Sequence, residues 1–236
     1  FNAADCYDTE GLRHWHLTMQ FVHETLEQLA ARIGSGCKLA LPKETSGAAM
    51  SITRALIQRG VRGLHLLCVP IGGLQADMLI GSDCVQCIET SAVSLGEYGA
   101  AARFVAAVRS GKVRILDATC PAIYAGLQAT EKGIPFMPLR GLIGSDILMH
   151  RTDWKRIANP YQADDEIVAI AAIQPDIALF HAPLADREGN VFIGTQRELM
   201  IMAHAAKQTL VSVERLSEDN LLANEALARP VIPSTS

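Results

Sequence analysis

The sequence has no long apolar run and no block of positive charge. Its apolar stretches are broken by Gly, Pro or a charged residue well before the roughly 18 to 20 residues that a membrane span requires. The 236 residues carry a formal net charge of -4 and no basic stripe of the kind that binds phosphate backbones. The opening residues Phe1 to Asp5 lack the basic and apolar regions of a signal peptide. We therefore expect a cytoplasmic protein with no nucleic acid and no membrane as a partner.

Cysteines are few, and their spacing fits neither a disulfide framework nor a metal site. The six cysteines are spread over a large chain, mostly in apolar or strand-like runs, which favours reduced thiols. Cys84 and Cys87 have a CxxC spacing, but a strand there points the two thiols to opposite faces and no second pair follows. His14 and His16 lack a matching carboxylate cluster. We expect no metal and no tightly bound cofactor.

Short apolar runs alternate with amphipathic stretches, several of which end at a glycine. The expected strands are 38–41, 63–69, 85–88, 113–116, 167–173, 176–181, 191–193 and 209–213. The expected helices are 17–33, 48–58, 100–109, 121–132 and 196–206, and residues 159–165 are expected to form a polar loop. Strands that alternate with helices predict an α/β fold, an open, mainly parallel twisted sheet with helices on both faces.

Nothing in the composition divides the chain, and 49% hydrophobic content at this length is enough for one core. We expect a single domain over residues 1–236. It includes an N-terminal helical segment, 1–36, and a tail, 229–236, whose turn-forming residues leave it loose or packed against a partner.

The residues that follow each strand are the candidates for function, because ligands of an open parallel sheet bind at the carboxyl ends of its strands. After the strand at 63–69 the chain reaches Gly72 and Gly73, whose backbone N–H groups could hold a carboxylate or an oxyanion. A tight strand-to-helix turn also uses glycine for its conformational freedom, which is the alternative reading of the pair.

Two further strand ends carry reactive or charged side chains. Arg140 lies among glycines, where a guanidinium could bind a substrate carboxylate or form an internal ion pair. Cys120 lies at an expected helix N-terminus, a setting that activates thiols, and His150 and His181 are the bases considered for it. A buried, inert cysteine is the stronger reading of that position.

Four blocks of the sequence, in this order and spacing, resemble the alpha subunits of family I coenzyme A transferases of the glutaconate coenzyme A transferase type. The central block runs from Ala125 to Asp146 and contains Gly-Leu-Gln and Arg-Gly-Leu-Ile-Gly-Ser-Asp. The others are the loop from Gly72 to Asp77, the turn from Ala185 to Val191 and the run from Thr209 to Arg215. The resemblance covers about residues 37–220 and implies the open sheet of this family, a fold of the NagB/RpiA-like type.

The resemblance implies a ping-pong transfer of coenzyme A between two carboxylic acids, with an acyl-CoA thioester as substrate. It also implies a partner, a separately encoded beta subunit. In such enzymes a glutamate on that partner attacks the thioester, and no segment of this chain resembles the one that carries it. We therefore expect no catalytic residue in this chain, with Cys120 as a minor exception. By position, the acid-substrate pocket is expected to include Gly72, Gly73, Gln75, Arg140, Gly144 and Ser145.

The chain departs from the family at two places, which keeps two other functions open. A glycine-rich segment is common after the first strand, whereas this chain has Leu41 to Gly47 there, so its pocket shape and substrate differ. A related branch resembles ring-opening hydrolases of steroid-derived coenzyme A thioesters and carries a glutamate where Cys120 stands. The alternatives are a hydrolase subunit, using for example Glu44, Glu89 or Glu97, and a non-catalytic ligand-binding protein.

Overall fold

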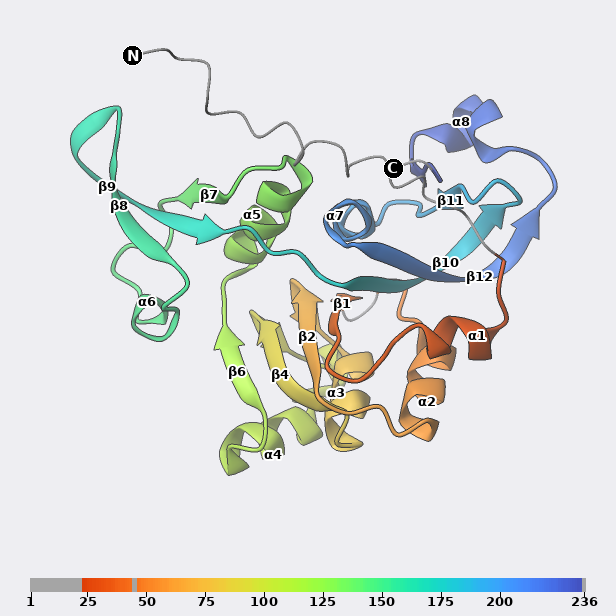
Figure 1. Ribbon diagram of the computed structural model, residues 1–236, viewed down its shortest axis with the longest axis horizontal. Helices are drawn as coiled ribbons and strands as arrows, with labels where there is room; N and C mark the ends of the chain where they lie inside the picture. Colours follow the sequence, from red (N-terminus) through yellow and green to blue (C-terminus); the bar gives the residue numbers. More distant parts are fainter. Residues whose placement is uncertain (1–22, 44–45, 235–236) are drawn as a thin grey trace, which may run out of the picture.

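The structure is a computed structural model that describes residues 23–43 and 46–234. The main sheet has the strand order β13-β11-β10-β1-β2-β4-β6, and β12 pairs with the other edge of β10 (Figure 1). Its strands are β1 (Lys38–Pro42), β2 (Leu64–Val69), β4 (Val85–Thr90), β6 (Arg114–Asp117), β10 (Ile177–Asp186), β11 (Val191–Phe192), β12 (Gln208–Ser217) and β13 (Val231–Ile232). All pairings are parallel except those of β11, which confirms the mainly parallel sheet.

Helices cover both faces of this sheet, as the alternation predicts. One face packs against α1 (Leu26–Ala31), α2 (Met50–Gln58), α3 (Leu74–Gly81) and α4 (Ala102–Ser110). The opposite face packs against α5 (Cys120–Glu131) and α7 (Glu198–Ala205). Successive residues of β1 alternate between the two cores, because Leu39 and Leu41 belong to the first and Ala40 to the second. None of the helices in residues 23–43 and 46–234 is long and apolar enough to cross a membrane.

Both ends of the described chain differ from the expectation. The helix expected at 17–33 is present as α1 only from Leu26, because Thr25 caps it: its hydroxyl accepts from Gln28 N, and Gln28 Oε1 accepts from Thr25 N. Residues 17–22, and with them His14, His16 and Cys6, lie outside the described part. In the expected tail, Val231–Ile232 form a buried strand that pairs antiparallel with β11.

A second, antiparallel sheet of three strands was not expected. Its order is β7 (Phe136–Leu139), β9 (Gln162–Ala171) and β8 (Lys155–Asn159), with α6 (Ile147–His150) between β7 and β8. We call this unit the arm; it extends to one side of the main sheet (Figure 1). The expected polar loop 159–165 is wrong for most of its length, because β8 ends at Asn159, only Pro160 and Tyr161 form the turn of the β8–β9 hairpin, and β9 begins at Gln162. The first half of β9 is polar and largely exposed. It therefore lacks the alternation of apolar and polar residues that indicates a strand.

Short elements complete the connections. They are β3 (Ile71–Gly72), β5 (Ala92–Val93), the 3₁₀ turns η2 (Gly96–Tyr98) and η3 (Leu221–Ala223), and α8 (Glu225–Ala228). The turn from Ala185 to Val191 is organised by the buried Asp186, whose carboxylate accepts hydrogen bonds from the backbone of Glu188, Asn190 and Leu221. This block of the family resemblance therefore has a structural role here.

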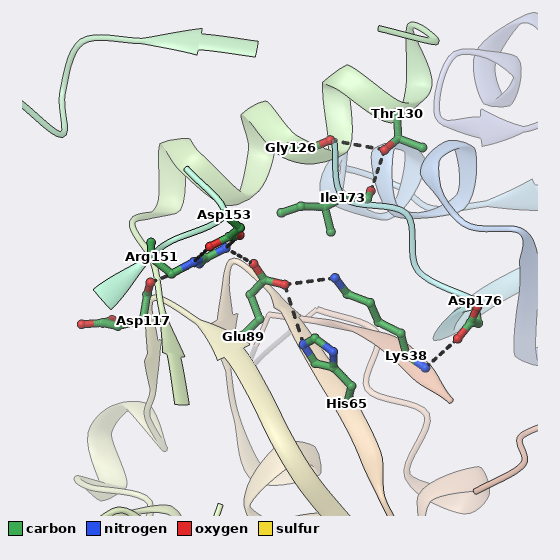
Figure 2. Close-up of polar contacts among 10 residues, drawn as sticks. All are labelled: Lys38, His65, Glu89, Asp117, Gly126, Thr130, Arg151, Asp153, Ile173 and Asp176. Atoms are coloured by element: carbon green, nitrogen blue, oxygen red, sulfur yellow. Dashed lines mark hydrogen bonds and ion pairs between the residues drawn. The ribbon is translucent and has the colours of Figure 1, made fainter. Parts of the chain in front are cut away.

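The glycine of the Gly-Leu-Gln block has a packing role. Gly126 lies inside α5 against the segment that leads from β9 to β10, and its carbonyl accepts a hydrogen bond from Ile173 N at 2.9 Å. Thr130, one turn further along α5, donates to the Ile173 carbonyl at 2.7 Å (Figure 2). A Cβ at position 126 would lie 2.5 Å from two side-chain carbons of Ile173, so only glycine fits.

Gly126→Ala is expected to lower the free energy of unfolding by about 1–3 kcal/mol, because the added methyl group must displace Ile173 from a well-packed core. Gly141→Ala is the matched control, since a Cβ at Gly141 meets nothing within 4 Å. Urea denaturation of the two variants measures the difference. Equal stability of the two variants would show that Ile173 moves aside without cost.

Candidate active site at the strand ends

The carboxyl ends of the parallel strands are aligned along one edge of the sheet. Pro42 of β1 pairs with Val69 of β2, and Thr90 of β4 pairs with Asp117 of β6. The residues that follow these strands therefore form a row along the edge. β1 lies at the point where the strand order reverses, with β2 on one side and β10 on the other. Such a reversal is where open α/β sheets bind ligands.

The glycine pair lies in this row, as expected from the sequence. Ile71–Gly72 form β3, which pairs with Ala92–Val93 after β4. A Cβ on Gly72 would lie 2.7 Å from Cys68 Sγ and 3.1 Å from Ala76 Cβ, so the close approach of the chain requires glycine there. Gly73 precedes the first turn of α3 with a negative φ, so its conformation is open to other residues. Binding of an acid by these backbone amides stays a prediction.

Gln75 is buried, whereas a residue that contacts substrate is expected to be partly exposed. Its side chain is 4% exposed and its Nε2 donates to Thr53 Oγ1 of α2 at 3.0 Å. Gln75 Oε1 is buried with no hydrogen-bond partner among the described residues. The amide thus links α3 to α2 beneath the glycine loop, and its contact with substrate remains a prediction.

The other three residues expected in the pocket lie on the arm. Arg140 follows β7; its side chain is 63% exposed and forms an ion pair with Asp165 of β9. Gly144 has a φ of +83°, which only glycine adopts easily, and Ser145 Oγ accepts a hydrogen bond from Ile147 N at the start of α6. The six expected residues therefore divide into one group on the main sheet and one on the arm.

Cys120 is at the first position of α5, as expected, and Thr119 caps this helix. Its Sγ lies 3.2 Å from the hydroxyl of Ser91, the residue after β4. His181 contacts other groups: its Nδ1 is 2.9 Å from Ser212 Oγ, and its Nε2 is 3.5 Å from Glu214 Oε1. The described contacts of Cys120 thus give it a hydroxyl neighbour rather than a histidine base.

One carboxylate at this edge was missed from the sequence. Glu198, in the first turn of α7, has a side chain only 9% exposed, and Lys43 Nζ, directly after β1, lies 3.3 Å from its Oε1. Burial raises the pKa of Tyr124, and the charges of Glu198 and Cys120 raise it further. No sequence signal could have joined Lys43 to Glu198, because the two lie in distant elements that only the fold brings together.

Glu89, one of the glutamates considered for chemistry, is instead part of a buried ion network (Figure 2). Its Oε1 accepts from Arg151 Nη2 at 2.7 Å, and its Oε2 accepts from Lys38 Nζ at 3.1 Å. Arg151 is 1% exposed and also binds Asp153, through two bonds of 2.7 and 2.9 Å. Glu89 therefore ties the main sheet to the segment that follows α6. Glu97 is exposed in η2, and Glu44 lies outside the described residues.

His65 of β2 borders the same network. Its Nε2 lies 3.8 Å from Glu89 Oε2. Burial lowers the pKa of His65, and the charges of Lys38, Arg114 and Arg151 lower it further, against an opposing effect of Glu89. The net effect favours the neutral form of the ring.

Beside the reversal of strand order, the strand ends of this open α/β sheet carry a glycine turn, a thiol and a lysine that pairs with Glu198. The chain belongs to the coenzyme A transferase family, whose pattern it matches over residues 23–232.

Named relatives agree with this family, and a solved structure shares its fold. The A-subunit of 3-oxoadipate CoA-transferase from Pseudomonas knackmussii is 29% identical over 203 residues, 83% of this chain and 70% of the relative. The A-subunit of glutaconate CoA-transferase from Acidaminococcus fermentans is 29% identical over 70% of this chain and 56% of its own length. The crystal structure of glutaconate coenzyme A-transferase from that organism superposes with a TM-score of 0.81 at 24% identity, covering 89% of this chain and 72% of that one.

A hydrolase is also related. The cholesterol ring-cleaving hydrolase IpdA subunit of Rhodococcus jostii is 28% identical over 72% of this chain and 59% of its own length.

Glu89→Ala is expected to lower the free energy of unfolding by about 3–5 kcal/mol, because it leaves the buried Arg151 with less compensating charge. The exposed Glu97→Ala is the control and is expected to change it by less than about 0.5 kcal/mol. Guanidinium denaturation measures both. If Glu89→Ala were as stable as the control, the network would not hold the arm to the sheet.

His65→Gln is expected to weaken the dependence of stability on pH. A His pKa below its unfolded value means that the unfolded chain binds more protons, so stability is lost as the pH falls through about 6.5 and towards the folded pKa. Wild type and variant are compared by urea denaturation between about pH 7.5 and 5.5. If the free energies of unfolding of wild type and variant fell by the same amount as the pH is lowered, His65 would not contribute to the pH dependence of stability.

Proposed function

We propose that this chain is the alpha-type subunit of a heteromeric coenzyme A transferase, which moves coenzyme A between two carboxylic acids and takes a coenzyme A thioester as substrate. The observation that carries the proposal is the reversal of strand order at β1, in a chain of this family. The strand ends beside it carry a glycine turn and a cation suited to carboxylate binding. Two relatives are the A-subunits of such transferases, which supports a separately encoded partner.

The nucleophile is proposed to be a glutamate of that partner. It attacks the acyl thioester and releases coenzyme A thiolate; the thiolate then attacks the glutamyl carbonyl of the resulting anhydride and releases the first acid. The second acid reverses both steps. In this chain, Glu89 is bound to Arg151 and Glu198 lies against Lys43, so both buried glutamates near the edge are paired with a cation. The roles left for this chain are to bind the acid and to exclude water.

The arm offers a surface for the partner subunit. Phe136, Ile143, Met149 and Tyr161 are all exposed, Tyr161 at 95%. Phe136 and Tyr161 line a shallow cleft of about 350 Å³. Large apolar side chains gathered on an exposed surface are typical of interaction sites.

A hydrolase subunit is the second candidate, because the ring-cleaving relative is nearly as similar as the transferases. Hydrolysis needs an activated water, and at the position where that branch is expected to carry a glutamate this chain has Cys120, whose Sγ lies 3.2 Å from the Ser91 hydroxyl.

The proposal is tested by assaying coenzyme A transfer from acetyl- and succinyl-CoA to a panel of dicarboxylic and 3-oxo acids. The chain is assayed alone and after co-expression with the product of the adjacent gene. Transfer only by the co-expressed pair is expected, with hydroxylamine converting the glutamyl-CoA thioester of the partner chain to a glutamyl hydroxamate. Turnover by this chain alone, or an adduct on it, would contradict the proposal. Thioester loss without an acid acceptor would favour the hydrolase.

A further inference from the structure

A cavity of about 680 Å³ lies along β12, and we call it the β12 cavity. Its size is within the range of small-molecule sites, about 300–1,000 Å³. Ser212 lines it, whereas neither Cys120 nor Lys43 of the strand-end site does. Much of the remaining wall is apolar and comes from α1, β12 and β13: Leu26, Leu29, Leu210, Val211, Val213 and Ile232. The cavity therefore combines a serine hydroxyl with an apolar surface, apart from the strand-end site.

Ser212 is joined to a histidine and a glutamate. Its Oγ lies 2.9 Å from Nδ1 of His181, its register partner on β10. The other ring nitrogen, Nε2, lies 3.5 Å from Glu214 Oε1. Glu214 is two residues beyond Ser212 on β12, so both side chains lie on the same face of the strand. A hydroxyl, an imidazole and a carboxylate in this order are the parts of an activated serine nucleophile.

The carboxylate determines which ring nitrogen carries the proton. A carboxylate only accepts hydrogen bonds, so Glu214 favours the tautomer of His181 with its hydrogen on Nε2. Nδ1 is then the acceptor, and the Ser212 hydroxyl donates to it. This is the direction that proton transfer from the serine to the imidazole requires.

The backbone around His181 is fixed by a glycine contact. His181 N donates to the Gly47 carbonyl at 2.6 Å. Gly47 has a φ of +64°, and a Cβ there would clash with the His181 carbonyl, so the contact requires glycine. The His181 side chain is 31% exposed, so its imidazole remains accessible to water.

The open edge of β12 offers a donor for the negative charge that develops on an attacked carbonyl. Among the described residues, β12 pairs with β10 alone, on one of its two sides. Alternate residues of an edge strand direct their N–H groups away from the sheet. Either Ser212 or the next residue, Val213, therefore presents its N–H at the open edge. Serine hydrolases take oxyanion donors from these two positions, the nucleophile and the residue after it.

The cations of the β12 cavity already have counter-charges. Arg32 donates two hydrogen bonds to Glu24, of 2.6 and 2.7 Å, and Lys207 Nζ donates to Asp176 at 2.8 Å. An anionic substrate would have to compete with these carboxylates. The apolar wall and the paired cations together favour a substrate with an uncharged acyl chain.

We propose that the β12 cavity is a second active site, which hydrolyses uncharged carboxylic esters with Ser212 as nucleophile and His181 as base. Ser212 Oγ bonds to the acyl carbon while its proton passes to His181 Nδ1. The ester C–O bond then breaks, and His181 gives this proton to the leaving alcohol. Water attacks the acyl-serine and gives one proton to His181, which returns it to Ser212 as the carboxylic acid leaves. Glu214 is a positioning residue that acts through His181.

This activity goes beyond the proposed transferase function and does not depend on it, since all three side chains belong to this chain. In the contrasting reading, the ring of His181 only links β10 to β12. A structural link gives the serine no heightened reactivity, whereas an activated serine reacts with a fluorophosphonate. Labelling therefore separates the two readings.

The full wild-type chain, alone and co-expressed with the product of the adjacent gene, is treated with an alkyl fluorophosphonate, and the labelled residue is identified by peptide mass spectrometry. Ser212 is expected to be labelled. A label on Ser212 in either sample supports the proposal, and its absence from both overturns it, whether or not any variant folds. The same samples are assayed with p-nitrophenyl butyrate and octanoate, which contain no coenzyme A and so cannot report the transferase.

Ser212→Ala and His181→Gln are each expected to lower kcat for p-nitrophenyl octanoate at least about 100-fold, the value of a general base and its nucleophile. Glu214→Gln is expected to lower kcat by a smaller factor with KM within about twofold, since Glu214 orients the base and does not bind the ester. Glu214→Asp, which keeps the carboxylate, is expected to restore part of kcat.

His204→Gln is the matched control. His204 Nδ1 likewise lies close to a glutamate, 2.9 Å from Glu131 Oε1, but its Nε2 is buried with no hydrogen-bond partner within residues 23–43 and 46–234. This variant is expected to leave ester hydrolysis and the labelling of Ser212 unchanged. Hydrolysis that persists at the wild-type rate in Ser212→Ala, or that falls as far in His204→Gln as in His181→Gln, would overturn the proposal.

Discussion

The reversal of strand order at β1 is the constraint on which the arrangement of this protein depends. Because β2 and β10 flank β1 on opposite sides, the chain leaves β1 towards α2 on one face, while α7 covers the other. Open α/β sheets bind ligands beyond the strand ends at such a reversal. Lys43 directly follows β1, and the first turn of α7 brings Glu198 to it.

A second dependence joins the sheet to the arm. Glu89 and Arg151 are both nearly inaccessible to water, and each needs the other's charge. Arg151 also lies 3.8 Å from the ring centroid of Trp154, and it donates to the Asp117 carbonyl at the end of β6. The arm is therefore fixed to the strand-end edge by charge as well as by packing. Its position matters because Arg140, Gly144 and Ser145 are carried on it.

The residues in the sequence blocks that resemble the family have different physical roles. Gly126 and Asp186 serve packing and turn formation, since each is surrounded by contacts within the fold. Gly72 makes a tight approach to Cys68 at the strand ends, which confirms its structural role, while its binding of an acid stays a prediction. Similarity in such blocks reports the scaffold of a coenzyme A transferase more directly than its substrate.

The sequence alone determined the main sheet, its helices and its candidate edge, because apolar periodicity and helix-ending glycines such as Gly111 and Gly133 act locally. It also placed Cys120 at a helix start. It did not indicate the arm, whose strand β9 is polar where exposed, nor the pairing of Glu89 with Arg151. Only the tertiary structure divided the expected pocket between sheet and arm and brought Lys43 to Glu198. Ion pairs between distant elements depend on chain geometry, and one sequence carries no local trace of them.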